Sequence, residues 1–177
     1  GSSHFNCPIL DNIESAMSHV SQFFQDLPVP DVRLARMIRD VAGEMSTRFD
    51  RHLRPHGLNE TDFRCLMQLI SSPGGQAYPS DLSQLATESR ANMTRIVDSL
   101  VERGWVTRRA SETDRRRIVL AVTAEGIALA RSLLPTFHPA LSAILSVLTE
   151  LEKEAMILGL QRIAASLNSQ PREGSLK

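Results

Sequence analysis

The sequence is poor in several features, and each scarcity excludes a class of protein. Its 177 residues include only two cysteines, Cys7 and Cys65, which are too few for a disulfide framework. No apolar run of about 18 residues occurs, so we predict no membrane-spanning segment. The N-terminus has no basic stretch followed by an apolar one, so we predict no export signal. We therefore expect a cytoplasmic protein.

The short motifs of common catalytic sites are also missing. The sequence has no glycine-rich phosphate loop, no G-x-S-x-G turn and no H-E-x-x-H zinc motif. His52 and His56 are spaced as metal ligands on a helix could be. Pro55 and Gly57, however, interrupt the helix that would align them. We predict no catalytic residue, no metal site and no cofactor, and hence a protein that is not an enzyme.

Net charge is absent overall, but the charges are unevenly distributed. The chain has 20 basic and 20 acidic residues, for a formal net charge of zero. Residues 1–88 carry 7 basic and 11 acidic side chains, and residues 118–177 carry 5 of each. Residues 89–117 carry 8 basic side chains, all arginine, and 4 acidic ones. The positive surplus therefore lies in one short segment, which indicates that this segment binds a polyanion such as nucleic acid.

Apolar periodicity predicts a mainly α-helical protein with one small β-hairpin. The predicted strands are 105–109 and 118–122, and the predicted helices are 9–27, 31–53, 60–71, 81–87, 90–103, 123–148 and 149–167. Side chains able to cap helix starts are Asp31, Ser80 or Asp81, Ser89 and Thr123. Gly104 is placed to end helix 90–103 as the left-handed residue that follows its last turn.

Two helices followed by a charged hairpin form the pattern of a winged helix-turn-helix. Helix 90–103 has one apolar stripe and one polar side, which fits the DNA major groove, where arginine reads guanine and asparagine can read adenine. Arginines at the hairpin tip suit a narrow minor groove. The predicted DNA-binding residues are Ser89, Arg90, Asn92, Thr94, Arg95, Arg115, Arg116 and Arg117. The alternatives are an ordinary solvated helix and turn, or a winged-helix module that binds protein and not DNA.

The same region resembles the MarR family of bacterial transcription regulators. The resemblance lies in SDLSQLA at 80–86 and SRANMTRIVDSLVERGWV at 89–106. It continues in DRRR at 114–117 and VTAEG at 122–126, close to the family's D-x-R and L-T-x-x-G, with Val122 where leucine is usual. Element order extends the resemblance over residues 31–167. The Arg-Gly-Trp turn and the prolines after the hairpin are most similar to EmrR-type efflux-pump repressors.

The resemblance implies a homodimeric repressor that binds double-stranded DNA at a pseudo-palindromic operator. It implies release by a small aromatic or phenolic molecule bound between the dimerisation helices and the winged region. By family position, Asp114 would brace the hairpin tip and Arg116 would enter the minor groove. With the resemblance, the predicted organisation is a helical dimerisation region at 31–71 and 123–167 and a winged helix-turn-helix at 72–122. From the residues themselves we predict a tag remnant and flexible tail at 1–8 and a flexible tail at 168–177. Helix 9–27 lies beyond the family's usual core, and its apolar stripe predicts a dimer arm or, alternatively, a local lid.

The resemblance also implies an effector pocket lined by the second and third helices, where apolar side chains would form the walls and an arginine could hold a carboxylate. Its predicted residues are Met45, Arg48, Phe49, His52, Phe63, Arg64 and Met67. The alternative is that the apolar members are simply core. A redox-sensing regulator of the same fold is a further alternative. It requires an accessible cysteine with a low pKa, whereas Cys65 lies in an apolar helix and Cys7 near the terminus.

Overall fold

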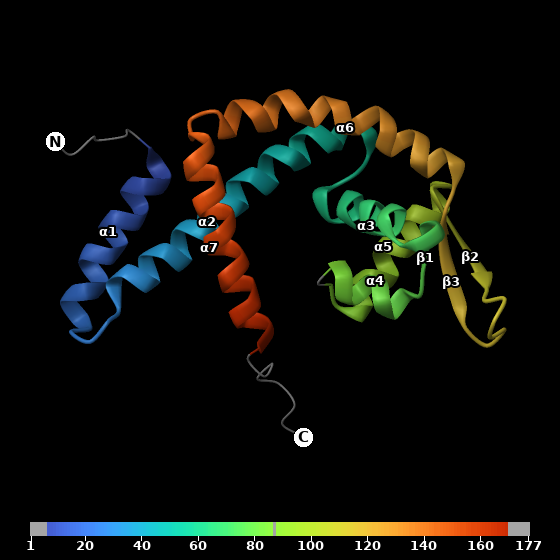
Figure 1. Ribbon diagram of the computed structural model, residues 1–177, viewed down its shortest axis with the longest axis horizontal. Coiled ribbons are helices and arrows are strands. Elements are labelled where there is room, and N and C mark those ends of the chain that lie inside the picture. Colours follow the sequence, from blue (N-terminus) through green and yellow to red (C-terminus); the bar gives the residue numbers. More distant parts are fainter. Residues whose placement is uncertain (1–6, 87, 170–177) are drawn as a thin grey trace, which may run out of the picture. The chain divides into compact units, whose positions relative to one another are not determined.

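The computed structural model describes residues 7–86 and 88–169 (Figure 1). It divides into two compact units, residues 1–130 and 131–177. The flexible tails predicted at 1–8 and 168–177 lie mostly outside the described residues. Of the described residues in these tails, Cys7 is extended, Pro8 begins the first helix, and residues 168 and 169 end the last one.

The predicted fold class, mainly helical with a small sheet, is confirmed. The helices are α1 (Pro8–Phe23), α2 (Val29–Leu53), α3 (Glu60–Ser71), α4 (Pro79–Ala86), α5 (Arg90–Glu102), α6 (Ala124–Leu145) and α7 (Glu150–Ser169). Short 3-10 turns at Arg54–His56 and Pro73–Gly75 follow α2 and α3. The strands are β1 (Gln76–Ala77), β2 (Val106–Ala110) and β3 (Ile118–Val122), in the antiparallel order β1-β3-β2.

Local signals placed the ends of the central helices correctly. The Ser89 side chain accepts a hydrogen bond from the Asn92 N–H at 3.1 Å and caps α5. Thr123 Oγ1 accepts one from the Gly126 N–H at 3.0 Å and caps α6. Gly104 follows α5 with φ +76°, a left-handed conformation that glycine adopts without strain. These three predictions are confirmed.

The starts of α2 and α4 and the end of α1 differ from the prediction. At the two starts, proline has more influence than the side chains that could cap the helix. Asp31 is not a cap, since α2 begins two residues earlier, at Val29, next to Pro28. Proline fixes φ near the helical value, so it starts a helix without a capping side chain. Likewise α4 begins at Pro79, and Asp81 lies within its first turn. Helix α1 ends at Phe23, short of the predicted Leu27.

The core of the first unit lies under the sheet and around α5. Helix α5 packs against α3, α4 and β2, and its predicted apolar stripe is buried. The fully or nearly buried side chains are Cys65, Leu66 and Leu69 of α3, Leu82 and Ala86 of α4, Met93, Ile96, Val97 and Leu100 of α5, and Val106 and Leu120 of the sheet. Burial of this stripe fixes which face of α5 remains exposed to solvent.

The N-terminal helix is anchored within the first unit. Helix α1 lies alongside α2 (Figure 1), buries Ile13 and Met17, and forms an ion pair between Glu14 and Arg33. Helix α2 itself leaves an apolar stripe exposed. Its members are Leu34, Ile38 and Val41, spaced as neighbours on one helix face.

The second unit contains the rest of α6 and the whole of α7. No residue of α7 is buried, although the helix carries many large apolar side chains. The exposed ones are Leu151, Met156, Ile157, Leu158, Leu160, Ile163 and Leu167. Among the described residues no single helix could cross a membrane; α6 and α7 meet the length and composition criteria only together, and they are bent by 102°.

Candidate nucleic-acid interface

The solvent face of α5 is built from short polar and basic side chains near the start of the helix. Arg90, Thr94 and Arg95 are exposed on it. Thr94 Oγ1 donates to the Arg90 carbonyl at 3.0 Å, which turns its hydroxyl toward the helix. At the far margin Asp98 pairs with Arg108 of β2. The basic character of this face is therefore concentrated at Arg90 and Arg95, in the first turns of α5.

Asn92 is half-buried and is held at both ends of its amide. Its Nδ2 donates to Glu88 Oε2 at 2.5 Å, and its Oδ1 accepts from Arg95 Nε at 3.1 Å. Arg95 Nη2 also lies 3.8 Å from Asp62 Oδ1. The structure therefore places Asn92 within a polar network in the first turn of α5, which also includes the exposed Arg95. Ser89, Arg90 and Thr94 are exposed to solvent.

Asp62 of α3 is the buried acidic group of this network. Its side chain is 8% exposed, and its Oδ1 has no hydrogen-bond partner among the described residues. Loss of solvation raises the pKa of Asp62, and the positive charges of Arg95 and Arg103 offset only part of that rise. Arg95 is thus attracted inward by the buried carboxylate of Asp62.

The wing, residues 111–117 between β2 and β3, is shaped around Asp114. Asp114 Oδ1 accepts from the Arg116 N–H at 3.0 Å, and its carbonyl accepts from the Arg117 N–H at 2.9 Å. These contacts form a tight turn that leaves the side chains of Arg115 and Arg116 in solvent. No ion pair joins Arg116 to any residue that the structure describes. Arg115 and Arg116 are therefore available to an external anion.

Arg117 is placed differently, and the residue that holds it is one that sequence reasoning did not assign. Its guanidinium lies 3.5 Å from the ring centroid of Tyr78, just before α4, in a cation–π contact. The Tyr78 hydroxyl lies 3.3 Å from Ser111 Oγ at the base of the wing. Hydrogen bonding with Ser111, and secondarily with Thr113, lowers the pKa of Tyr78 below its usual value. Tyr78 thereby attaches the wing to α4.

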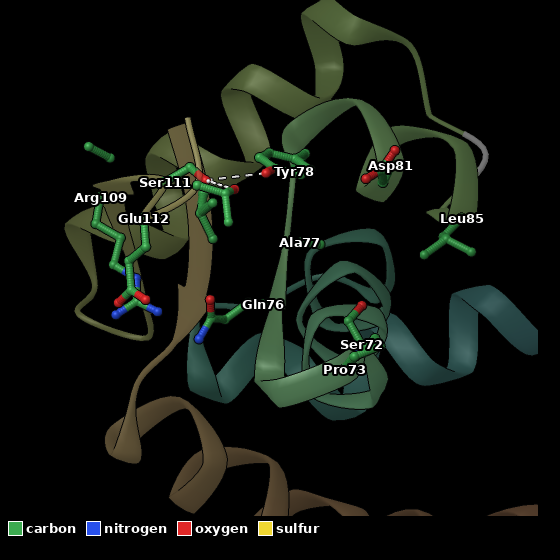
Figure 2. Close-up of a pocket in the computed structure, with 13 residues that line it drawn as sticks. Ser72, Pro73, Gln76, Ala77, Tyr78, Asp81, Leu85, Arg109, Ser111 and Glu112 are labelled. Atoms are coloured by element: carbon green, nitrogen blue, oxygen red, sulfur yellow. Dashed lines mark hydrogen bonds between the residues drawn. The ribbon is translucent and has the colours of Figure 1, made fainter. Parts of the chain in front are cut away.

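Beneath this contact lies a cavity of about 420 Å³. Figure 2 shows Arg109 and Glu112 on one side of it, and Asp81 and Leu85 on the other. A second cavity, of about 300 Å³, lies beside Arg90, Thr94 and Arg108. Both cavities border the winged region.

Arg103 links the end of α5 to the segment after α2. Its guanidinium donates to the carbonyls of His56 at 2.7 Å and Gly57 at 2.5 Å, and it stacks over Trp105 at 4.2 Å. Gly57 has φ +69°, and a Cβ there would collide with the guanidinium. Arg103 therefore has a structural role, although it belongs to the basic segment.

Comparison with known proteins identifies the family to which this chain belongs. A sequence model of the MarR family matches residues 56–117. Over 162 residues, 92% of each chain, the sequence is 31% identical to the transcriptional repressor MprA of Escherichia coli strain K12. The chain belongs to the MarR family. The HTH-type transcriptional regulator MhqR of Bacillus subtilis strain 168 is 30% identical over 73% of this chain and 86% of MhqR.

Solved structures of MarR-family regulators share the fold. AbsC of Streptomyces coelicolor superimposes with a TM-score of 0.73 at 22% identity, over 81% of this chain and 98% of AbsC. Sco3205 from the same organism, solved in complex with DNA, gives 0.73 at 24% identity, over 84% of this chain and 96% of Sco3205. The predicted winged helix-turn-helix is therefore confirmed as the fold.

As a MarR-family member, the chain is a transcriptional regulator and not an enzyme. Homodimers and responses to ligands are typical of the family. The placement nearest to EmrR-type repressors stays a prediction, as do the assigned roles of individual residues.

The effector residues predicted for this MarR-family chain lie on α2 and α3, away from both cavities described above. Both arginines among them form ion pairs within the chain. Arg48 forms an ion pair with Glu44 at 3.2 Å, and Arg64 Nη2 donates to Glu88 Oε1 at 3.0 Å. The predicted pocket of Met45, Arg48, Phe49, His52, Phe63, Arg64 and Met67 stays a prediction.

The redox alternative receives no support at Cys65. The thiol is fully buried, and burial raises its pKa to about 11, so the reactive thiolate is disfavoured. Cys7 is partly exposed just before α1. No group of three or more potential metal ligands occurs within residues 7–86 and 88–169.

Proposed function

We propose that this protein is a cytoplasmic, dimeric repressor that binds a pseudo-palindromic operator in double-stranded DNA and is released by a small aromatic or phenolic effector. The observation that carries the proposal is the pair of unpaired arginines, Arg115 and Arg116, on a wing turn built around Asp114. Together with Arg90 and Arg95 on α5, they present positive charge from the segment in which the sequence concentrates its surplus.

Binding to DNA follows from where these charges lie. Arginine that neutralises phosphate releases condensed counterions, and this supplies affinity without sequence preference. Side chains in the first turns of a recognition helix reach the base edges, as Arg90 and Arg95 would from α5. The wing would contribute a minor-groove or backbone contact. Asp114 supports that contact by holding the turn rather than by touching DNA.

Dimerisation is supported by the apolar surface that the single chain leaves in water. Soluble monomers rarely expose large contiguous apolar patches, and a helix that is apolar on most sides needs a partner. Helix α7 exposes large apolar side chains on more than one face and buries none of its residues, and α2 adds the stripe of Leu34, Ile38 and Val41. We assign both to the dimer interface, with α1 as an arm of each protomer. Two protomers related by two-fold symmetry would present two α5 helices to successive major grooves.

Replacing one wing arginine tests the function directly. Arg116→Ala is expected to weaken binding to the DNA upstream of the gene by about tenfold and to reduce the salt slope by about 1 for each wing. Fluorescence anisotropy between about 50 and 200 mM salt measures both. Arg39→Ala, which removes the same charge from an exposed site on α2, should change neither. Equal effects from the two variants would mean that the wing does not contact DNA.

Effector binding has a separate test. A ligand that binds only the folded state at about 100 times its Kd stabilises that state by about 2.7 kcal/mol. Phenol, benzoate and related planar aromatic acids are therefore expected to raise Tm by about 5–10 °C and to release DNA. Thermal melts and anisotropy across such a panel measure this. A protein that binds DNA but responds to no member of the panel would contradict the effector assignment.

A further inference from the structure

A chain of polar contacts runs from α3 to the exposed face of α5. Arg64 Nη2 donates to Glu88 Oε1 at 3.0 Å, and the other oxygen of Glu88 accepts from Asn92 Nδ2 at 2.5 Å. Asn92 Oδ1 then accepts from Arg95 Nε at 3.1 Å. We call Glu88 and Asn92, with these contacts, the Glu88 bridge. It ends on the arginine that the sequence predicts to read a base.

The bridge is fixed at its base. The Glu88 N–H donates to the Ser83 carbonyl at 3.0 Å, and Ser83 Oγ donates to the Glu88 carbonyl at 2.6 Å. Ser83 is buried in α4, and the Glu88 side chain is only 16% exposed. A carboxylate with so little solvent around it forms strong charge-assisted hydrogen bonds. Its two oxygens are therefore held in place before any DNA arrives.

The same contacts decide what Asn92 can do. An asparagine reads adenine by using its amide nitrogen and oxygen together. In Asn92 the nitrogen donates to Glu88 and the oxygen accepts from Arg95, so reading adenine with both atoms would have to compete with these two contacts. Arg95 gives only its Nε to Asn92 and keeps its two terminal nitrogens, one of them 3.8 Å from Asp62 Oδ1. Its 56% exposed side chain retains donors for guanine or phosphate.

We infer that Glu88 and Asn92 are positioning residues for Arg95, and that Arg95, not Asn92, makes the base contact from this part of α5. The bridge fixes one edge of the guanidinium, which lowers the conformational entropy that Arg95 loses on binding. This inference rests on the proposed function and revises the sequence-based assignment of Asn92 as an adenine reader.

A double-mutant cycle on operator binding tests the bridge. Asn92→Ala is expected to lower affinity about fivefold, since it frees Arg95 without removing its charge. Arg95→Ala should lower affinity by about 30-fold, and the double variant should be no weaker than Arg95→Ala. Glu88→Gln loses the charged contact to Arg64. It should lower the logarithm of the operator affinity by about half as much as Asn92→Ala does. The Arg116→Ala and Arg95→Ala pair is the control, because Arg116 lies on the wing and no hydrogen bond or ion pair among the described residues joins it to Arg95, and their effects should add.

A second measurement is the preference for each base of the operator. This preference would not change if Asn92 only stabilised the fold. Binding to operators randomised one position at a time should show Asn92→Ala relaxing preference at the positions that Arg95→Ala relaxes, and at no other. Melting curves recorded beside each titration exclude unfolding as the cause, and Glu88→Gln repeats the test if Asn92→Ala does not fold.

Two results would overturn the inference. Additive losses from Asn92→Ala and Arg95→Ala would show that the two residues act independently. A preference lost at a position that Arg95 does not affect would show that Asn92 contacts a base itself. In both cases the wild type still binds DNA and the proposed function stands. A wild type without salt-dependent DNA binding would instead refute the proposed function.

Discussion

Leu160→Glu in α7 is expected to convert a dimer into a monomer and to lower operator affinity by more than about 100-fold. Leu160 lies between Met156 and Ile163 on a stripe that continues to Leu167. All four side chains are exposed in the single chain, Leu167 by 68%. Burying a leucine contributes about 1.5–3 kcal/mol, and two-fold symmetry counts each substitution twice. A glutamate adds the cost of burying a charge.

Size-exclusion chromatography with light scattering measures the change, from twice the 19.6 kDa chain mass to the chain mass itself. Gln161→Glu adds the same charge to the neighbouring, polar side of α7 and should leave the dimer intact. Operator affinity should fall together with the dimer, because one protomer contacts only one half-site. If Leu160→Glu remained dimeric and bound DNA normally, the α7 stripe would lie outside the interface.

The basic segment, residues 89–117, shows what a count of charged residues can and cannot predict about function. Counting arginines in residues 89–117 correctly indicates where positive charge gathers, but it treats all of them alike. The structure separates them by their contacts. Arg103 binds backbone carbonyls, Arg108 pairs with Asp98, and Arg117 lies over Tyr78. The reading surface is therefore narrower than the charge count suggests.

The features that could be predicted are those decided by neighbours in the chain. The apolar stripe of α5, the Ser89 cap and the turn at Gly104 depend on residues within one or two helical turns. The Tyr78 contact with Ser111 joins residues 33 positions apart, and Arg64 meets Glu88 across 24. The periodic spacing of residues along the sequence gives no information about such distant pairs. Strand β1 was missed for the same reason, since two residues form a strand only because β3 lies beside them.

Gly126 is a position where one added methyl group is expected to destabilise the fold. It lies buried in the first turn of α6, where its N–H donates to Thr123 Oγ1 at 3.0 Å. A Cβ there would collide with the Trp105 carbonyl oxygen and would lie 3.0 Å from Val122 Cγ2. The Trp105 carbonyl cannot retreat freely, because it accepts a hydrogen bond from the Thr123 N–H at 3.0 Å. One methyl group would therefore force the start of α6 away from the start of β2.

Gly126→Ala is expected to destabilise the fold by about 1–3 kcal/mol and to lower Tm by about 3–10 °C. This loss exceeds the roughly 0.5–1 kcal/mol that alanine gains over glycine within a helix. Gly43→Ala in α2 is the matched control, because nothing lies within 4 Å of its added Cβ, and it should raise Tm slightly. Urea unfolding of both variants measures the difference. If Gly126→Ala were as stable as Gly43→Ala, the junction of β2 and α6 would be looser than its contacts indicate, and it could not hold the wing in a fixed orientation.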